Sequence, residues 1–383
     1  MRCKKNRIFD LFVHYINTNF IMRIHFLSTL IVIVLTACTS VNNPSITSEK
    51  WGTADSKPVY LYTLTNTHGV NVKITNYGCI IVEYNAPDRN GKLGNIVLGL
   101  STFNAYHAGH PFFGAIVGRY ADIIENATFT LDGTTYKLSG EGHGGKKGFD
   151  KKVWDATTSS DKQSATLSLK YVSPDGEEGY PGNLSVNVDY ILNNDNELQI
   201  RYTATTDKPT VLNLTNHSYF NLTDCKEDVL NHQIIIYANE YTPYIDDINV
   251  PTGEFATVEG TPYDLRQWTV LGSRFASLTR GYDHCFYIKG TLNKPVLAAE
   301  LYEPKSGRLL QTYTTEPGIQ LYTAHYLDGS TKGAQGAVHT RYMGACLETQ
   351  HFANSPNTPT FPSTVLRPGE TYKQMTTYKV GVK

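Results

Sequence analysis

The sequence predicts an all-β protein built as a large antiparallel β-sandwich, and three observations support this fold class. The 383-residue chain contains 26 tyrosines and is rich in Thr, Asn and Gly, a composition typical of strands and turns. Several segments alternate apolar and polar residues with a period of two, as half-buried strands do. No stretch shows a sustained helical period, and no nucleotide-binding glycine loop follows a predicted strand, which disfavours a Rossmann-type enzyme.

The overall composition allows one large soluble domain and argues against nucleic acid as a partner. Hydrophobic residues make up 40% and charged residues 18% of the chain, enough apolar material for a sizeable core. The formal net charge is -1, which gives no electrostatic reason to expect nucleic acid as a partner.

The first 37 residues read as a signal peptide region, with Met22 as the expected start and residues 1–21 as an upstream extension. After Met22 come Arg23 and His25, an apolar run over residues 26–35, and the small residues that precede Cys38. The apolar run is shorter than the roughly 20 residues of a membrane span. The alternative is an uncleaved anchor helix.

Leu35-Thr36-Ala37-Cys38 resembles the lipobox of bacterial lipoproteins, in which the cysteine is acylated and becomes the first mature residue. We therefore expect Cys38 to be lipidated and residues 38–49 to act as a flexible tether, because residues 39–49 are rich in Ser, Thr, Asn and Pro. The protein is then exported and lipid-anchored to the bacterial envelope, on the periplasmic side or at the cell surface. The folded domain is expected over residues 50–383, as a monomer.

Four cysteines remain in that domain, at positions 79, 225, 285 and 346, and none are spaced as CxxC. The spacing predicts no metal site, and we expect them to pack as small residues.

Strands and turns follow one another along the domain. Ala165–Tyr171 and Leu184–Tyr190 alternate cleanly, as strands buried on one face do. Turn signals lie at residues 88–91, 131–133, 193–196, 304–307 and 368–369. Antiparallel pairing of the strands follows from such short connections.

Segment 211–222 is the most polar strand-like segment. If it is extended, Asn213, Thr215, His217, Tyr219 and Asn221 share one face, and Leu212, Leu214, Phe220 and Leu222 share the other. This polar face suggests the floor of a cleft; an ordinary solvated face is the equally weighted alternative.

Three further segments place polar groups among apolar neighbours. Glu348 and Gln350 share one face of a strand-like run, and Gln320 and Tyr322 share one face of another. Asp283 lies among aromatic residues. A carboxylate in such surroundings either costs folding free energy or serves a function. Each segment by itself is more often structural than functional.

Several short segments of the sequence together closely resemble signature segments of the galactose mutarotase, or aldose 1-epimerase, family, and they occur in the family's order. The strongest three are Asn213-Leu-Thr-Asn-His-Ser-Tyr-Phe-Asn-Leu222, Gly281-Tyr-Asp-His284 and Leu347-Glu-Thr-Gln350. Others include Gly118-Arg-Tyr-Ala121, His143-Gly-Gly145 and Leu366-Arg-Pro-Gly-Glu370, so the resemblance runs from about residue 55 to the end.

The resemblance implies a galactose mutarotase-like supersandwich, and residues 50–383 are then one aldose 1-epimerase domain. It also implies an isomerase that interconverts the α and β anomers of free aldoses such as galactose or glucose. Glu348 corresponds to the family's general base and His217 to its general acid. His143, Asp283 and Gln320 match positions that contact sugar hydroxyls, and we expect Tyr219 to contact the sugar as well.

The implied reaction removes the proton of the C1 hydroxyl and protonates the ring oxygen, so one base and one acid suffice. Glu348 is expected to act as a carboxylate and His217 as an imidazolium. No electron or group transfer occurs, so no cofactor is expected.

The sequence departs from the family pattern at one side of the expected cleft. Asp122-Ile123 stands where family members commonly have Asn-Arg, which removes a multi-donor cation from the cleft. Asp122 is expected to accept hydrogen bonds from sugar hydroxyls. Arg119 either reaches into the cleft instead or is structural. Residues 139–142, which lead to His143, are also atypical.

Two alternatives to the epimerase remain. The first is a catalytically weak sugar-binding lipoprotein of the same fold, motivated by Asp122-Ile123 and the lipid anchor. The second is a glycoside hydrolase that uses Glu348 and Asp283 as its two carboxyl groups. The presence of His217 beside the family motifs disfavours both.

Overall fold

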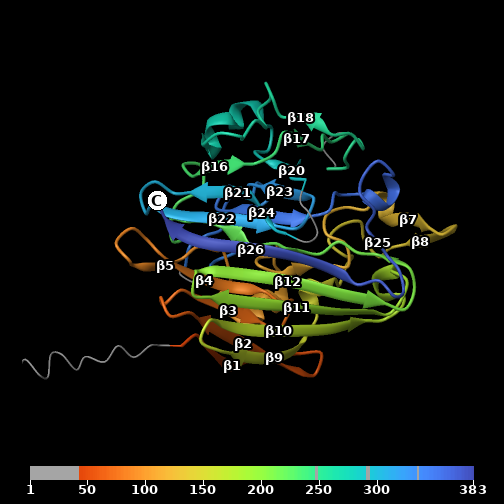
Figure 1. The fold of residues 1–383 in the computed structure, drawn as a ribbon, viewed down its shortest axis with the longest axis horizontal. Coiled ribbons are helices and arrows are strands. Elements are labelled where there is room, and N and C mark those ends of the chain that lie inside the picture. Colours follow the sequence, from red (N-terminus) through yellow and green to blue (C-terminus); the bar gives the residue numbers. More distant parts are fainter. Residues whose placement is uncertain (1–42, 246–248, 290–293, 334–335) are drawn as a thin grey trace, which may run out of the picture. The chain divides into compact units, whose positions relative to one another are not determined.

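Strands dominate the computed structural model, and every strand pair in the described residues is antiparallel (Figure 1). The structure describes residues 43–245, 249–289, 294–333 and 336–383, and the folded unit runs from Asn43 to Lys383. The predicted signal region, Cys38 and residues 39–42 lie outside the described residues. The sequence-based prediction of an all-β antiparallel fold is confirmed.

A nine-stranded sheet forms one layer of the unit. In spatial order its strands are β19 (Thr269–Val270), β16 (Gln233–Ile236), β21 (Val296–Tyr302), β22 (Arg308–Thr314), β26 (Tyr372–Val382), β12 (Glu197–Thr206), β11 (Leu184–Asn193), β10 (Ser164–Ser173) and β9 (Asp155–Ser160). The two segments predicted as strands lie in β10 and β11, which pair with each other along their full lengths.

Two smaller sheets lie opposite the nine-stranded sheet. The five-stranded sheet has the order β1 (Ser45–Ala54), β2 (Lys57–Thr65), β3 (Asn71–Thr75), β4 (Ile81–Pro87) and β5 (Leu93–Asn95). The six-stranded sheet has the order β15 (Tyr219–Phe220), β24 (Ala345–Gln350), β23 (Gly318–Tyr322), β20 (Asp283–Tyr287), β17 (Glu240–Tyr241) and β18 (Ala256–Thr257).

Short elements complete the fold. Three two-stranded pairs are β13 (Thr210–Val211) with β25 (Val365–Leu366), β14 (Thr215–Asn216) with β6 (Ile116–Val117), and β7 (Thr128–Leu131) with β8 (Thr134–Lys137). Helical segments are short: α2 (Phe103–Ala108), η1 (Glu125–Ala127), η2 (Phe149–Lys151), η3 (Glu177–Gly179), η4 (Leu271–Ser277) and η5 (Ser355–Asn357). In the described residues no helix has the length and apolar character needed to cross a membrane.

The main hydrophobic core lies between the two layers. Leu167 and Val188 of the nine-stranded sheet, Val72 of the five-stranded sheet, and Leu321 and Leu347 of the six-stranded sheet belong to one continuous cluster of buried residues. Burial alternates along β11 and β12, because one face of those strands meets this core and the other meets solvent. β23 and β24 are buried at every position, so both faces of these two strands are covered.

Many of the tyrosines connect the layers through their hydroxyls. The Tyr190 hydroxyl donates to the Cys79 carbonyl at 2.6 Å, and the Tyr378 hydroxyl donates to the Leu347 carbonyl at 3.1 Å. Both tyrosines are fully buried, so their rings fill the core while the polar ends remain satisfied. The tyrosine content of the sequence therefore reflects packing more than ligand contact.

The start of the folded unit differs from the prediction. β1 begins at Ser45 and pairs with β2 from Ser45 opposite Thr65 onward, whereas a tether was expected up to residue 49. The segment is polar because most of β1 is exposed. Exposed strands at a sheet edge carry the same Ser, Thr and Lys residues as linkers do, so composition did not separate the two.

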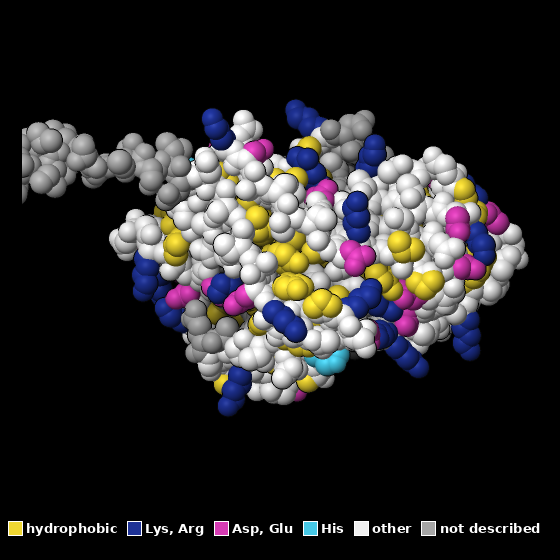
Figure 2. All heavy atoms as spheres, turned by 90° about the horizontal axis from the view of Figure 1, so that it is seen from below, with side chains coloured by type: hydrophobic (Ala, Val, Ile, Leu, Met, Phe, Trp, Pro, Cys, Tyr) yellow, Lys and Arg dark blue, Asp and Glu magenta, His cyan; other side chains and the backbone are white. Residues whose placement is uncertain are grey.

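The four cysteines of the domain are free and buried, as expected for packed small residues. On the face shown in Figure 2, Lys and Arg side chains are interspersed with Asp and Glu around groups of apolar side chains. This mixture of both signs agrees with the near-zero net charge of the chain.

Candidate active site

A cleft of about 570 Å³ opens over the six-stranded sheet, a size within the usual range for small-molecule sites. Its lining comes from loops, from β20, β23 and β24, and from the segment around His217. The lining residues are Pro111, Phe112, Asp122, Ile123, Glu141, Gly142, His143, His217, Tyr219, Asn249, Asp283, Gln320, Tyr322, Tyr326, Glu348 and Gln350. All seven residues predicted to act on the sugar are among them.

The floor of the cleft is set by strand register. Gln320 of β23 lies directly opposite Glu348 of β24, and Asp283 of β20 lies opposite Tyr322. Because side chains alternate along a strand, Glu348 and Gln350 face the cleft while Leu347 enters the main core. The two predicted face pairs, Glu348 with Gln350 and Gln320 with Tyr322, are thereby confirmed.

Segment 211–222 is not one continuous strand. It forms β13, β14 and β15 in turn, and all its residues are buried. The leucines and Phe220 of the predicted apolar face do lie in the main core. The solvated-face alternative is wrong, because each polar side chain is enclosed.

Two of the three asparagines of this segment, Asn213 and Asn221, are structural. Asn213 Nδ2 donates to the carbonyls of Ala121 and His351, and Asn221 Nδ2 donates to the carbonyls of Glu227 and Met343. These bonds fasten the cleft floor to the surrounding loops. Of the predicted polar face, only His217 and Tyr219 line the cleft.

His217 and Glu348 face each other across the deepest part of the cleft. His217 Nε2 lies 3.6 Å from Glu348 Oε2, and the residues are only 4% and 3% exposed. His217 Nδ1 lies 3.6 Å from the Cys346 thiol. The imidazole stacks on Tyr219 at 5.0 Å and on Phe112 at 5.9 Å between ring centroids, with interplanar angles of 22° and 21°. This packing fixes the ring so that Nε2 points towards Glu348.

His143 and Asp122 form the opposite wall. The Asp122 amide donates to His143 Nδ1 at 3.2 Å, and the His143 amide donates to the Asp122 carbonyl at 2.9 Å. Both residues, like Phe112, have positive φ angles of 50° to 63°. Such conformations are uncommon for non-glycine residues and recur at functional sites. The bond to Nδ1 requires that nitrogen to be unprotonated.

The third wall carries two glutamine side chains, and the described residues leave their amide oxygens without a hydrogen-bond donor. Gln320 Nε2 donates to Asp283 Oδ1 at 2.8 Å, and Gln350 Nε2 donates to Asp122 Oδ2 at 3.4 Å. The Oε1 atoms of both glutamines are buried, and no described residue bonds to them. Buried acceptors without partners are rare, so these atoms indicate where a donor-rich ligand such as a sugar binds.

Burial shifts the pKa values of the cleft residues towards their neutral forms. Burial raises the pKa of Glu348 well above its usual value, and the carboxyl groups of Asp122 and Asp283 raise it further. Burial, followed by the nearby His143, lowers the pKa of His217 well below its usual value. Both shifts are towards the neutral forms, a protonated Glu348 and an unprotonated His217, and so oppose the expected carboxylate and imidazolium.

The other groups follow the same rule. Burial, with a contribution from Lys151, lowers the pKa of His143 to about 4. Burial, followed by the Asp283 carboxyl, raises the pKa of Asp122 to about 7, and burial raises that of Asp283 to about 6. These two carboxyl groups titrate near neutral pH.

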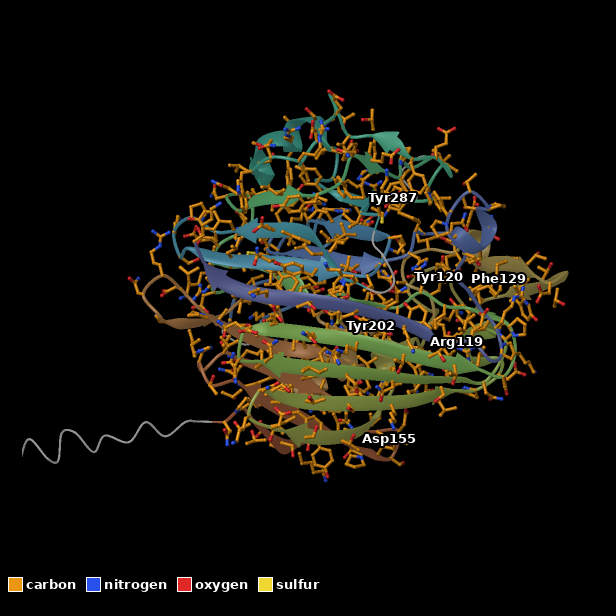
Figure 3. The ribbon with its side chains drawn as sticks, viewed as in Figure 1. Arg119, Tyr120, Phe129, Asp155, Tyr202 and Tyr287 are labelled. Atoms are coloured by element: carbon orange, nitrogen blue, oxygen red, sulfur yellow. The ribbon has the colours of Figure 1, made fainter. Side chains whose placement is uncertain are left out.

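Arg119 does not reach into the cleft. It is 2% exposed, and its guanidinium donates to Ser173 Oγ and to the carbonyls of Ser173, Pro174, Pro181 and Gly182. Figure 3 places it beside the ends of the long strands of the nine-stranded sheet. Its role is structural, so Arg119 does not supply a cation to the cleft.

Tyr219 lines the cleft, but its hydroxyl donates to the Pro111 carbonyl at 2.8 Å. Its ring supports His217, and we assign it mainly this positioning role.

One group of described residues has ligand atoms close enough for a metal: His217, Cys346 and Glu348, within 4.8 Å of one another. Burial raises the pKa of the Cys346 thiol well above its usual value, which disfavours the thiolate that a metal requires. His217 and Glu348 are also the two groups predicted to act as the acid and the base. That no metal takes part remains a prediction.

Phe112 and Cys346, which both contact His217, were not found from the sequence, and Asn249 was also missed. Phe112 belongs to an apolar run, residues 111–113, with no polar group to mark it. Its positive φ and its stacking are visible only in the folded chain.

Comparisons with known proteins agree with this site. The family model described as aldose 1-epimerase matches residues 60–379. Galactose mutarotase of Sus scrofa is 42% identical over 320 residues, which cover 82% of this chain and 92% of that protein. Aldose 1-epimerase of Escherichia coli K12 is 35% identical over 338 residues, covering 85% of this chain and 96% of that protein.

Solved structures show the same likeness. Galactose 1-epimerase from Lactobacillus acidophilus NCFM superimposes with a TM-score of 0.77 at 29% identity, covering 89% of this chain and 99% of that one. The GalM/aldose epimerase homologue from C. elegans gives a TM-score of 0.76 at 28% identity, covering 82% and 96%. The chain therefore belongs to the aldose 1-epimerase family.

Proposed function

We propose that the protein interconverts the anomers of a free aldose by opening and re-closing the sugar ring, with Glu348 and His217 as the base and the acid. The observation that carries this proposal is the opposed pair, whose Nε2 and Oε2 atoms lie 3.6 Å apart at the bottom of a sugar-sized cleft. The family to which the chain belongs makes it an isomerase.

The proton balance of the reaction closes within this pair. Glu348 as carboxylate takes the C1 hydroxyl proton, and His217 as imidazolium protonates the ring oxygen while the C1–O bond to that oxygen breaks. The open-chain aldehyde then faces a protonated Glu348 and a neutral His217. After rotation about the C1–C2 bond, the same two transfers run backwards and close the ring from the other face.

Burial shifts the pKa values of the pair towards the protonation state that it has when the sugar ring is open. Sugar hydroxyls that donate to Asp122, Asp283 and Glu348 shift these groups towards their ionised forms, since hydrogen bonds to a carboxylate lower its pKa. Substrate binding thereby prepares Glu348 to act as the base.

Polarimetry on freshly dissolved α-D-galactose and α-D-glucose tests the proposal. Glu348→Gln and His217→Asn are each expected to lower the catalysed rate by about 10² or more, since a general acid or base contributes about that factor. Glu259→Gln and His68→Asn, both exposed, serve as matched controls. No acceleration by the wild type on either sugar, together with measurable sugar binding, would support the weak sugar-binding alternative.

We also propose that the mature protein is exported and anchored through a lipid on Cys38. The support is the sequence of residues 22–38 alone. Metabolic labelling of bacteria with an alkyne fatty acid is expected to mark the wild type and not Cys38→Ser. Recovery of unlabelled wild type in the cytoplasmic fraction would end this proposal.

A monomer is the proposed working unit, because residues of one chain supply the whole cleft lining. Light scattering on the eluting protein checks the mass.

A further inference from the structure

Four carboxyl groups line the catalytic cleft, and none of the described lining residues is Lys or Arg. The four belong to Asp122, Glu141, Asp283 and Glu348. Glu141 is exposed, whereas the other three residues are half-buried or buried. The proposed proton transfers use only the Glu348 carboxyl group, so they do not account for the other three.

Every side-chain amide of the described cleft lining directs its nitrogen to one of these carboxyl groups. Asn249 Nδ2 donates to Asp283 Oδ2 at 3.0 Å, and Gln320 Nε2 donates to Asp283 Oδ1 at 2.8 Å. Gln350 Nε2 donates to Asp122 Oδ2 at 3.4 Å. A carboxylate only accepts hydrogen bonds, so the amide nitrogens face it and the amide oxygens are left over.

Two of these leftover oxygens are buried acceptors. Gln320 and Gln350 are 5% and 1% exposed, and no described residue bonds to the Oε1 atom of either. Both side chains line the cleft. A ligand that binds here therefore meets carboxyl and amide oxygens, while the amide hydrogens are already in use.

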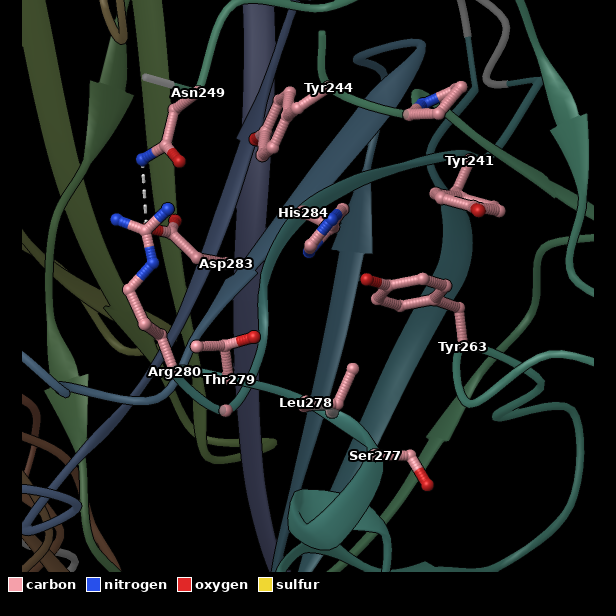
Figure 4. Close-up of a pocket in the computed structure, with 12 residues that line it drawn as sticks. Tyr241, Tyr244, Asn249, Tyr263, Ser277, Leu278, Thr279, Arg280, Asp283 and His284 are labelled. Atoms are coloured by element: carbon pink, nitrogen blue, oxygen red, sulfur yellow. Dashed lines mark hydrogen bonds between the residues drawn. The ribbon is translucent and has the colours of Figure 1, made fainter. Parts of the chain in front are cut away.

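The two aspartates differ in how close a positive charge lies. The Arg280 guanidinium lies beside Asp283 in Figure 4, and its charge acts on that carboxyl group. Lys151, whose charge acts on the wall that carries Asp122, is paired with Asp150 at 2.6 Å. No described Lys or Arg side chain bonds to the Asp122 carboxyl group. Asp122 is therefore the carboxyl group at which a cationic ligand gains most.

From this arrangement we infer that the preferred substrate is an amino sugar, an aldose whose ammonium group binds between the Asp122 carboxyl group and Gln350 Oε1. An ammonium group donates three hydrogen bonds and accepts none, so it matches a place whose free atoms are acceptors. A hydroxyl group there donates one hydrogen bond, and its oxygen then lies against other oxygens. The inference rests on the proposed function, which seats C1 of the sugar at Glu348.

The strand register limits which carbon carries the ammonium group. Gln350 lies two residues beyond Glu348 on the same face of β24, roughly 7 Å along the strand. In the proposed reaction Glu348 meets the C1 hydroxyl and His217 meets the ring oxygen. The ring carbons that follow C1 on the side away from the ring oxygen are C2 and C3. We therefore expect the ammonium group on one of these two carbons.

The test compares D-glucosamine and 3-amino-3-deoxy-D-glucose with D-glucose, because the three sugars share one ring and a free C1 hydroxyl. Polarimetry at pH 7, where the amines are largely protonated, follows each anomer exchange, and the uncatalysed rate is subtracted. For the wild type, kcat/KM for the better amino sugar is expected to exceed that for D-glucose by about tenfold. That factor corresponds to one charge-assisted hydrogen bond.

Asp122→Asn removes the charge and keeps an oxygen that can accept from Gln350. It is expected to reduce the ratio of amino sugar to glucose kcat/KM to about one. Glu141→Gln is the matched control, because it removes an exposed carboxyl group of the same cleft. Its ratio should stay within about twofold of the wild-type ratio, since exposed charges are screened by water and salt. Circular dichroism checks that both variants are folded.

Equal kcat/KM values for the amino sugars and D-glucose in the wild type would overturn the inference while leaving the epimerase intact. A preference that Asp122→Asn leaves unchanged would do the same. An equal fall of the ratio in Glu141→Gln would also overturn it, because the attraction would then come from the net charge of the cleft instead of binding at Asp122.

Calorimetric titration with the same three sugars separates failure of this inference from failure of the proposed function. If the wild type accelerates none of the sugars, tighter binding of an amino sugar that Asp122→Asn abolishes would still establish the ammonium site. Equal binding of all three sugars in that case would overturn the ammonium site together with the epimerase.

Discussion

At the scale of single residues, the charge of the cleft is its most unusual property. Asp122, Asp283 and Glu348 line it together with two histidines, and none of the described lining residues is Lys or Arg. The Asp122 and Asp283 carboxyl groups raise the pKa of Glu348, and Asp283 raises that of Asp122, because burial limits screening by water. Asp122 belongs to the Asp122-Ile123 pair in which this chain departs from the expected family pattern, so its carboxyl group is the natural target for a test.

Asp122→Asn is expected to move the acidic limb of the kcat/KM profile to lower pH. The Asp122 carboxyl group is, after burial, the largest contribution to the raised pKa of Glu348, so removing it lets Glu348 ionise at lower pH. Polarimetry across a buffer series measures the shift. Asp195→Asn, in an exposed turn, is the matched control, and an unmoved limb would show that Glu348 does not feel Asp122.

The same substitution is expected to change the pH dependence of stability. The pKa of Asp122 is raised to about 7 in the folded state from 3.8, so the folded state binds the proton more tightly. Its contribution is fully present at low pH and is lost as pH rises between these two values. The free energy of unfolding of Asp122→Asn, measured relative to that of the wild type, should rise by about 1 kcal/mol between pH 5 and pH 8, after discounting for partial exposure. Urea unfolding at both pH values measures this difference.

At the scale of elements, β23 and β24 connect the main core to the cleft. One face of each strand packs into the main core, and the other face presents Gln320, Glu348 and Gln350 to the cleft. Tyr378 of β26 supports β24 from the core side, because its hydroxyl donates a hydrogen bond to the carbonyl of Leu347, the residue before Glu348. The position of the base therefore depends on a contact between the two layers.

Tyr378→Phe is expected to lower the free energy of unfolding by about 1 to 2 kcal/mol, since it removes a buried hydrogen bond and leaves a carbonyl less well satisfied. Calorimetry or urea unfolding measures the loss. Tyr313→Phe on β22 is the control, because no described residue bonds the Tyr313 hydroxyl. Equal stability of the two variants would show that the hydroxyl contributes nothing net.

Alternation along β10 and β11 made the antiparallel strands predictable, and the turn signals at 131–133, 193–196 and 304–307 do separate neighbouring strands. Local patterns succeed there because one face meets the core and the other meets water. Local patterns did not predict the burial of the polar face of segment 211–222. Both faces of this segment are enclosed, so neither of them meets solvent. Strands of two residues with irregular connections are too short to show an alternation of apolar and polar residues in the sequence.

At the scale of the whole molecule, the fold opposes a nine-stranded sheet to a five-stranded and a six-stranded sheet. The strand β1 closes the edge of the five-stranded sheet by pairing with β2. Half-buried Ile46 of β1 packs against the main core. The first residues of the folded unit therefore contribute to its stability.

A chain that begins at Lys50 is expected to melt a few degrees lower than one that begins at Asn43, because it lacks Ser45–Glu49 and uncovers the edge of β2. Scanning calorimetry of the two chains measures the difference, and the chain from Asn43 is the control. Identical melting temperatures would indicate that the first half of β1 adds no stability.

The sequence by itself determined the fold class and the family, and it predicted seven residues that the structure brings together in one cleft, because strand alternation and motif order are properties of the chain. Tertiary structure alone decided that His217 and Glu348 meet at 3.6 Å, that Phe112 and Cys346 hold the imidazole, and that Arg119 is structural. It also decided that burial raises the pKa of Glu348 and lowers that of His217. The reason is physical: distance, desolvation and the charge of neighbours arise between residues far apart in the chain, and no local pattern encodes them.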